Sequence, residues 1–261
     1  MIVPSQSTVD RRRLLFGLLP AAALLAAGCA QPKTEQPPAQ PPSTPPPLAL
    51  VYNGPQGCTD CAPAVATLLR NAPRPYRVEF VTAPTAAALA GAQLYVQPGG
   101  GADLDGTWRQ LKGSAGVIRD WVRGGGSYLG LCFGAYLAGR DPGFDLLPGD
   151  TEGYAGSPGS TVPDDRHTVI KVDWQGKSRH MYFQDGPTFV LAANATATVL
   201  ASYPNGKPAV LVAPFGKGRV GVSGPHPEAD ESWYAEHGLR NPDGVRLDLA
   251  HELIEATTGG R

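Results

Sequence analysis

The chain has no excess of positive or of negative charge. Lys and Arg number 22 against 23 Asp and Glu, and charged residues make up only 17% of the sequence. After Arg13 there is no run of basic residues and no nucleic-acid-binding motif. Binding to DNA or RNA depends on basic side chains that neutralise phosphates. We therefore expect no nucleic-acid partner.

A long apolar run is missing as well. The longest, from Leu14 to Ala27, is shorter than the roughly 20 residues that a membrane-spanning helix needs. It follows Arg11, Arg12 and Arg13 and leads into small residues, which is the pattern of an export signal. The paired arginines indicate the twin-arginine route. We expect residues 1–28 to be this signal.

Cysteine is scarce, with four in the chain, and the first falls directly after the expected signal. The stretch Leu25-Ala-Ala-Gly-Cys29 resembles a bacterial lipobox, in which the cysteine becomes the lipid-bearing N-terminus. We expect Cys29 to anchor the protein to the membrane on the extracytoplasmic side; the alternative is simple cleavage and release. Eight of the 17 residues 31–47 are proline, so residues 29–47 form an extended linker.

The next two cysteines, Cys58 and Cys61, form a Cys-x-x-Cys pair. Outside the cytoplasm a disulfide is the favoured interpretation, and free thiols or a redox role are the alternatives. One such pair supplies only two ligands, which is too few for structural zinc. We expect neither a metal nor another cofactor.

The rest, residues 48–261, has the length of one α/β domain. Short apolar strands are predicted at 48–52, 76–81, 92–96 and 127–131, with helical patterns between them. This alternation predicts a parallel sheet covered by helices on both faces. Two hairpins, turning at residues 175–177 and 216–218, predict an antiparallel extension.

The fourth cysteine follows the last of these strands in Gly130-Leu-Cys132-Phe-Gly134. Cys132 could be a small buried hydrophobe, the common role of free cysteine. A strand, a Gly-x-Cys-x-Gly turn and a helix also describe a nucleophile elbow, where the N–H of Phe133 faces an oxyanion. His226 and Glu228, in a His-Pro-Glu sequence at the end of the second hairpin, supply a base and a group to orient it.

These blocks together resemble the class I glutamine amidotransferase-like superfamily, and within it the family named for the N-terminal domain of biotin–protein ligase. The resemblance implies a flavodoxin-like three-layer fold, with Cys132 as nucleophile, His226 as base and Glu228 as its partner. It also implies an oxyanion hole made by the backbone amides of Gly100 and Phe133. The blocks that carry it are Leu50–Gly54, Tyr95–Gly101, Gly125–Ala138 and Tyr182–Phe189.

One position departs from the glutamine-hydrolysing members, which usually carry Gln where this chain has Tyr136. We expect Tyr136 to border the substrate pocket and to alter its substrate. Gln184 and Asp185 lie in a loop that either faces this pocket or is a solvated turn. His167, His180, His237 and His251 have no ligand-like spacing, and Trp233 and Tyr234 are assigned to packing.

The sequence thus predicts an exported amidotransferase-like enzyme that hydrolyses an amide-type bond through a thioester. The substrate is a small molecule or a component of the cell envelope. No ligase domain is expected before the chain ends at Arg261, so biotinylation is not expected. The alternative is a non-catalytic binding or assembly module that keeps the pocket; a redox protein using Cys58 and Cys61 is a third interpretation. The oligomeric state stays open.

Overall fold

The computed structural model describes residues 45–101, 103–140 and 142–260. The expected export segment, Cys29 and the linker up to residue 44 lie outside the described residues. Those that are described belong to one compact unit. Across these ranges, no helix combines the length and the apolar character that crossing a membrane requires.

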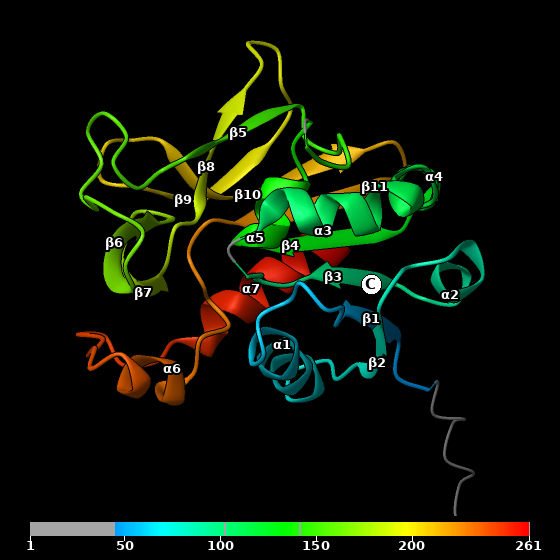
Figure 1. Ribbon diagram of the computed structural model, residues 1–261, viewed down its shortest axis with the longest axis horizontal. Helices are drawn as coiled ribbons and strands as arrows, with labels where there is room; N and C mark the ends of the chain where they lie inside the picture. Colours follow the sequence, from blue (N-terminus) through cyan, green and yellow to red (C-terminus); the bar gives the residue numbers. More distant parts are fainter. Residues whose placement is uncertain (1–44, 102, 141, 261) are drawn as a thin grey trace, which may run out of the picture. The chain divides into compact units, whose positions relative to one another are not determined.

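The parallel half of the central sheet has the strand order β2-β1-β3-β4-β11 (Figure 1). The strands β1, β3 and β4 are buried along their whole length, because helices cover both faces of the sheet. β2 forms the exposed edge. The bounds are Leu48–Tyr52 for β1, Arg77–Val81 for β2, Leu94–Gln97 for β3, Ser127–Leu131 for β4 and Gly218–Ser223 for β11.

Two helical layers enclose this half of the sheet, as Figure 1 shows. Successive strand residues point to opposite faces. In β1, Ala49 and Val51 pack with α1 and α7, whereas Leu50 and Tyr52 pack on the side of α2 to α5. The helices are α1 Cys61–Arg70, α2 Ala86–Ala90, α3 Leu104–Leu111, α4 Ala115–Gly124, α5 Phe133–Leu137 and α7 Leu247–Thr258. The predicted three-layer α/β fold is confirmed.

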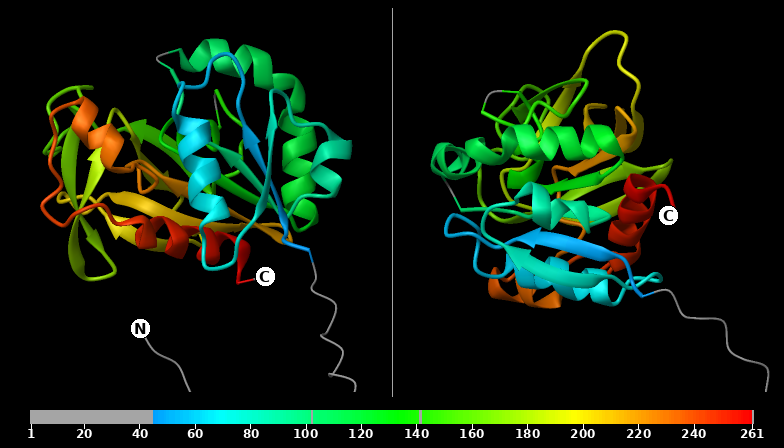
Figure 2. Two further views of the ribbon diagram at one scale, coloured as in Figure 1. Left: turned by 90° about the horizontal axis from the view of Figure 1, so that it is seen from below. Right: turned by 90° about the vertical axis from the view of Figure 1, so that its right-hand side faces the viewer.

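The antiparallel extension is present, and it continues the same sheet. β11 is parallel to β4 on one side and antiparallel to β10 on the other, so the sheet changes from parallel to antiparallel at the β10–β11 hairpin. The antiparallel part continues through β9 and β6 to β7. Figure 2 shows these strands at one end of the sheet, with α6 (Glu231–Glu236) beside them. The remaining strands are β6 Thr168–Trp174, β7 Lys177–Phe183, β9 Thr198–Ser202, β10 Pro208–Phe215 and the separate pair β5 Gly149–Gly153 and β8 Pro187–Leu191.

The tight turn between β4 and α5 depends on two glycines. A Cβ atom on Gly134 would overlap the carbonyl oxygen of Gln97 at the end of β3. One on Gly130 would overlap the carbonyl oxygen of Gly134, which also accepts a hydrogen bond of 2.7 Å from the Tyr128 hydroxyl. The backbone of the elbow therefore packs directly on the neighbouring strand.

Replacing Gly134 with alanine is expected to destabilise the protein by about 3 kcal/mol, because the backbone of Gln97 has no room to move away. The matched control is Gly116→Ala in α4, where an added Cβ meets no atom within 4 Å. That change is expected to stabilise the protein by up to about 1 kcal/mol through helix propensity. Urea unfolding measures both, and equal midpoints would show that the elbow tolerates a side chain.

Candidate active site

Cys132 lies between the end of β4 and the start of α5, in a backbone conformation that L-residues rarely adopt. Its φ is 48° and its ψ is −102°. Its N–H donates a hydrogen bond of 2.7 Å to the carbonyl of Ser223, the last residue of β11. Non-glycine residues held in such a conformation cluster at functional sites. The strain is retained here by the packing around Gly130 and Gly134.

His226 reaches Cys132 because β11 is the neighbour of β4 in the sheet. The chain leaves β11 at Ser223 and arrives at His226 three residues later, where the His226 N–H donates to the Tyr182 carbonyl at 2.9 Å. The imidazole Nδ1 lies 2.8 Å from Oε1 of Glu228. Cys132 is the other side chain close enough to His226 to raise its pKa. The structure thus brings Cys132, His226 and Glu228 into one connected row.

The charges in this row favour a protonated imidazole. Burial by itself would lower the pKa of His226, but the charges of Cys132 and Glu228 and the hydrogen bonds to both raise it to about 10. At neutral pH the ring is then an imidazolium next to the cysteine sulfur. The sulfur also lies 3.3 Å from the carbonyl oxygen of Gln184, which can accept a hydrogen bond from it. The sulfur therefore has two polar neighbours, the ring and this carbonyl.

Glu228 is a buried carboxylate whose side chain is directed at the histidine. Oε1 accepts from His226, whereas Oε2 has no hydrogen-bond partner among the described residues. A buried carboxylate with one unpaired oxygen is costly unless an opposite charge lies next to it. The imidazolium supplies that charge, so Glu228 both orients the ring and stabilises its protonated form.

The two expected oxyanion donors lie against each other. The Phe133 N–H belongs to the first turn of α5, where a helix offers it no acceptor. The backbone of Gly100 packs on the Phe133 ring so closely that an added Cβ would lie 2.6 Å from it. Gly100 lies in the loop after β3, and Phe133 follows Cys132 directly. Their role as donors remains a prediction.

A cavity of about 310 Å³ opens above these residues, at the carboxyl ends of the parallel strands. Ligands bind at this end of open α/β sheets. Its floor contains Gly99, Gly100, Cys132 and His226. Its walls contain Cys58, Cys61 and Gln184, and an aromatic side formed by Tyr182, Trp233, His167 and His237. Among the residues that the structure describes, no group of His, Cys, Asp and Glu is arranged to hold a metal ion.

The aromatic side of the cavity corrects the sequence-based assignment of its histidines. The His167 and His237 rings are stacked, with centroids 3.6 Å apart, and Nδ1 of His167 lies 2.5 Å from the Tyr182 hydroxyl. Trp233, assigned to packing, lines the cavity and lies against His226, whereas Tyr234 is buried as expected. These residues come from β7, α6 and adjacent loops, so no spacing along the chain reveals that they meet.

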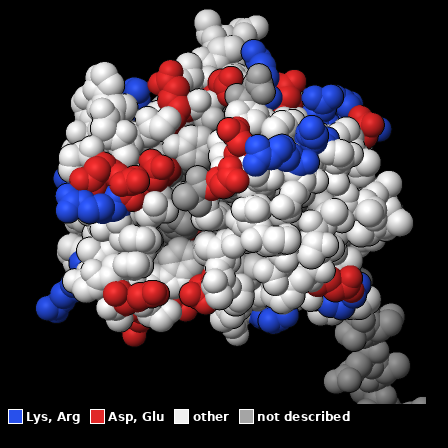
Figure 3. Space-filling model, viewed as in Figure 1, with Lys and Arg blue, Asp and Glu red and all other residues white. Residues whose placement is uncertain are grey.

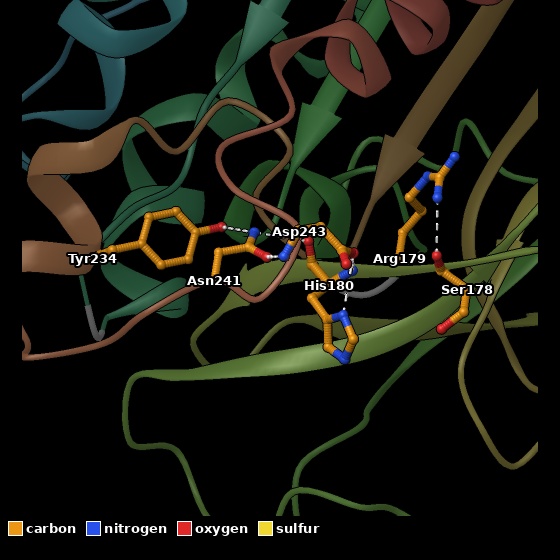
Figure 4. A network of polar contacts seen from close by, with 6 residues as sticks. All are labelled: Ser178, Arg179, His180, Tyr234, Asn241 and Asp243. Carbon is orange, nitrogen blue, oxygen red and sulfur yellow. Dashed lines mark hydrogen bonds and ion pairs between the residues drawn. The ribbon is translucent and has the colours of Figure 1, made fainter.

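A polar cluster fixes α6 and the loop after it to β7 (Figure 4). The Asp243 carboxylate accepts from the backbone N–H of His180 at 2.7 Å and lies 3.1 Å from its Nδ1. Asn241 donates to the His180 carbonyl and to the Tyr234 hydroxyl. Burial raises the pKa of Asp243, but the hydrogen bonds from His180 outweigh it and hold the pKa below its usual range. This cluster, Tyr234–His180–Asn241–Asp243, holds the aromatic wall in place.

The three residues expected to border the substrate have different positions. Gln184 lines the cavity, whereas Tyr136 and Asp185 are not among its lining residues. Tyr136 is half-buried on α5 and faces Gly153 of β5. Burial, with the charges of Asp185 and Cys132, raises its pKa well above its usual range. Tyr136 therefore lies close enough to Cys132 to affect its electrostatics from outside the cavity.

Charges of both signs are scattered over the face drawn in Figure 3, with no extended surface of a single sign. Many belong to exposed ion pairs, such as Arg140 with Asp145 and Lys207 with Glu152. Within the cavity lining, the acidic side chains are Asp60 and Glu236, and no Lys or Arg of the described residues takes part. The imidazolium of His226 is the positive charge at the floor of the cavity.

The fold is that of the class I glutamine amidotransferase-like proteins. A solved glutamine amidotransferase matches with a TM-score of 0.57 at 18% identity, over 80% of this chain and 98% of the other. PurLQS from Thermotoga maritima matches with a TM-score of 0.56 at 16% identity, over 82% of this chain and 98% of the other. At these identities the likeness establishes the fold.

Sequence comparison identifies a more specific similarity, to the N-terminal region of biotin–protein ligases. Residues 48–152 match the family described as "Biotin-protein ligase, N terminal", a region that includes Cys58, Cys61 and Cys132. Biotin–protein ligase of Schizosaccharomyces pombe is 31% identical in an alignment 209 residues long, which covers 69% of this chain and 33% of that protein. The chain thus spans about a third of the length of this relative. The resemblance expected from the sequence blocks is confirmed.

Replacing Glu228 with glutamine tests the electrostatic arrangement. The amide oxygen can still accept from Nδ1, but the negative charge that helps to raise the pKa of His226 is lost. The ring is then expected to lose its proton at a lower pH than about 10. NMR titration of the His226 ring nitrogens measures this, with the exposed Glu231→Gln as control. An unchanged titration would mean that Glu228 does not stabilise the imidazolium.

Proposed function

We propose that this protein is a cysteine hydrolase that cleaves an amide-type bond through a thioester. The observation that carries the proposal is the buried row at the floor of a cavity, in which Glu228 is hydrogen-bonded to His226 and His226 lies next to Cys132. A nucleophile, a base and a group that orients the base are the parts that such chemistry needs. The amidotransferase-like fold supports the assignment.

In the first step, Sγ of Cys132 attacks the carbonyl carbon of the substrate. The negative charge that develops on the carbonyl oxygen is stabilised by the N–H groups of Phe133 and Gly100. His226 then donates its proton to the leaving nitrogen, the C–N bond breaks, and a thioester remains. In the second step, His226 takes a proton from water, the resulting hydroxide attacks the thioester, and the sulfur leaves as a thiolate.

The acidic side chains of the cavity favour an amide substrate that is neutral or carries a protonated amine. Asp60 and Glu236 attract such an amine, whereas the imidazolium of His226 lies at the floor, next to the reacting bond. The stacked His167 and His237 rings and Trp233 offer flat surfaces to a planar or apolar group. Ligation of biotin is not part of the proposal, because the family match concerns the N-terminal region of the ligase.

We place this hydrolase at the cell envelope, exported and attached to the membrane by a lipid on Cys29. The support is the sequence alone: the basic and apolar leader, the lipobox-like stretch and the proline-rich linker. The linker would hold the folded unit away from the membrane. The substrate would then be a component of the envelope or a small molecule that reaches it.

Acylation by an activated ester tests the hydrolase. With p-nitrophenyl acetate, the wild-type protein is expected to release a burst of nitrophenolate and to gain one acetyl group on the Cys132 peptide. His226→Ala is expected to acylate about 100-fold more slowly, because general base and acid catalysis are lost. His251→Ala on α7, outside the cavity, is the control. Equal acylation rates in all three proteins would refute the proposed role of His226.

Mass spectrometry of the mature N-terminus tests the anchor. The wild-type protein is expected to begin at a lipidated Cys29 and to fractionate with membranes. Cys29→Ser is expected to carry no lipid. A wild-type chain with an unmodified N-terminus would contradict the anchor and would leave the hydrolase proposal unaffected.

One observation favours a second candidate, a binding module without turnover. The Gln184 carbonyl, 3.3 Å from Sγ, stabilises the neutral thiol and competes with the thiolate form. Such a module would bind a neutral or cationic ligand in the same cavity. In the ester experiment it would show no acetyl-cysteine and no burst, so the two candidates give opposite results.

A further inference from the structure

The disulfide and the free cysteine of the folded unit share one cavity. Cys58 and Cys61 are joined by a disulfide between the end of β1 and the start of α1, and both line the cavity with Cys132. Cys132 is the free cysteine of the described residues. The proposed hydrolysis uses Cys132 alone, so the disulfide next to it has no role in that chemistry.

Cys61 is the sulfur that lies next to the catalytic row. A Cβ atom on Gly99 would lie 2.8 Å from Sγ of Cys61 and 3.2 Å from Cε1 of His226. The Cys61 sulfur and the His226 ring carbon therefore both approach the point where a Cβ of residue 99 would lie. Because residue 99 is glycine, no side chain fills this space. The Cys61 sulfur therefore lies beside the ring of the base, and it lines the same cavity as Cys132.

Cys58 is the sulfur prepared to leave. Its Sγ accepts a hydrogen bond of 3.0 Å from the backbone N–H of Cys61. That N–H opens the ten-residue helix α1, whose N-terminal end favours negative charge. A thiolate released at Cys58 would thus be stabilised where it forms, and a stabilised leaving thiolate speeds exchange.

We propose that Cys132 and the Cys58–Cys61 pair carry out thiol–disulfide exchange within the cavity. The Cys132 thiolate attacks Sγ of Cys61, a Cys132–Cys61 bond forms, and the Cys61–Cys58 bond breaks with its electron pair passing to Cys58. No net oxidation occurs and no further reactant is needed. The reverse attack by Cys58 restores the free nucleophile.

This exchange is an activity beyond the proposed hydrolysis, and it does not depend on it. In the exchanged form the sulfur of Cys132 is blocked, while Cys58 becomes a thiolate open to the cavity. The same protein then presents one of two nucleophiles, Cys132 or Cys58, to the same cavity. Any disulfide-bearing molecule that enters could react with the exposed Cys58.

Cysteine variants of the full chain test the geometry. In Cys58→Ser, oxidised glutathione is expected to produce a Cys61–Cys132 disulfide, detected by peptide mass spectrometry without reduction. The matched control, Cys61→Ser, leaves Cys58 and Cys132, which are expected to become glutathionylated separately. The yield of the internal disulfide is expected to be about tenfold higher in Cys58→Ser, because the Cys61 sulfur is the one that lies beside the His226 ring. Equal yields, or none in Cys58→Ser, would overturn the proposal.

Alkylation of the unreduced wild-type protein tests the exchange itself. Iodoacetamide is expected to give two singly labelled products: one labelled at Cys132 with the native disulfide, the other at Cys58 with a Cys61–Cys132 disulfide. In Cys132→Ser, the label on Cys58 is expected to be lost. If Cys58 is not labelled in the wild type, or if it is labelled equally in Cys132→Ser, the exchange is refuted. Neither experiment uses an acyl substrate, so failure here is distinct from failure of the hydrolase.

Discussion

The parallel pairing of β4 with β11 is the constraint on which the site depends. Its register sets Gly130 opposite Val222 and Leu131 opposite Ser223, and the Cys132 N–H continues the ladder to the Ser223 carbonyl. Two chain segments almost a hundred residues apart thus end at the same edge of the sheet. At this edge the chain enters α5 directly after Cys132, and the chain that leaves β11 brings His226 back over Cys132. The pairing of the two strands therefore brings the two side chains together.

Close backbone approach accompanies this pairing. Gly134 against Gln97, Gly99 against Cys61 and Gly186 against Gly224 are places where a Cβ would meet a neighbouring atom. Each brings a loop at the carboxyl end of a strand towards the cavity. The floor of the cavity is therefore built largely from main-chain atoms. Few positions in it can accept a larger side chain without displacing the nucleophile.

Much of the fold and the central site residues follow from local sequence patterns. Strand and helix periodicity, the glycines around Cys132 and the His-Pro-Glu sequence are each visible within a few residues. The aromatic wall is not, because Tyr182, His167 and His237 meet only through the pairing of β7 with the backbone of His226. The helix α7 has no counterpart among the sequence-based predictions, although Leu249, Leu253 and Ile254 have helical spacing. Tyr136 was expected at the pocket, but its hydroxyl lies close to Gly153 of β5 and the residue is not part of the cavity lining.

The aromatic wall rests on a small apolar cluster of its own. Tyr182, Ala229 and Tyr234 form this cluster apart from the two large cores that enclose the sheet, and the contacts of Asp243 and Asn241 with His180 supplement it. A segment held by so few buried side chains opens at a lower free energy than the strands beneath it. Local unfolding of residues 229–245 would therefore uncover the cavity while the sheet stays intact. Access to the cysteine would then be governed by the stability of this segment, with no hinge required.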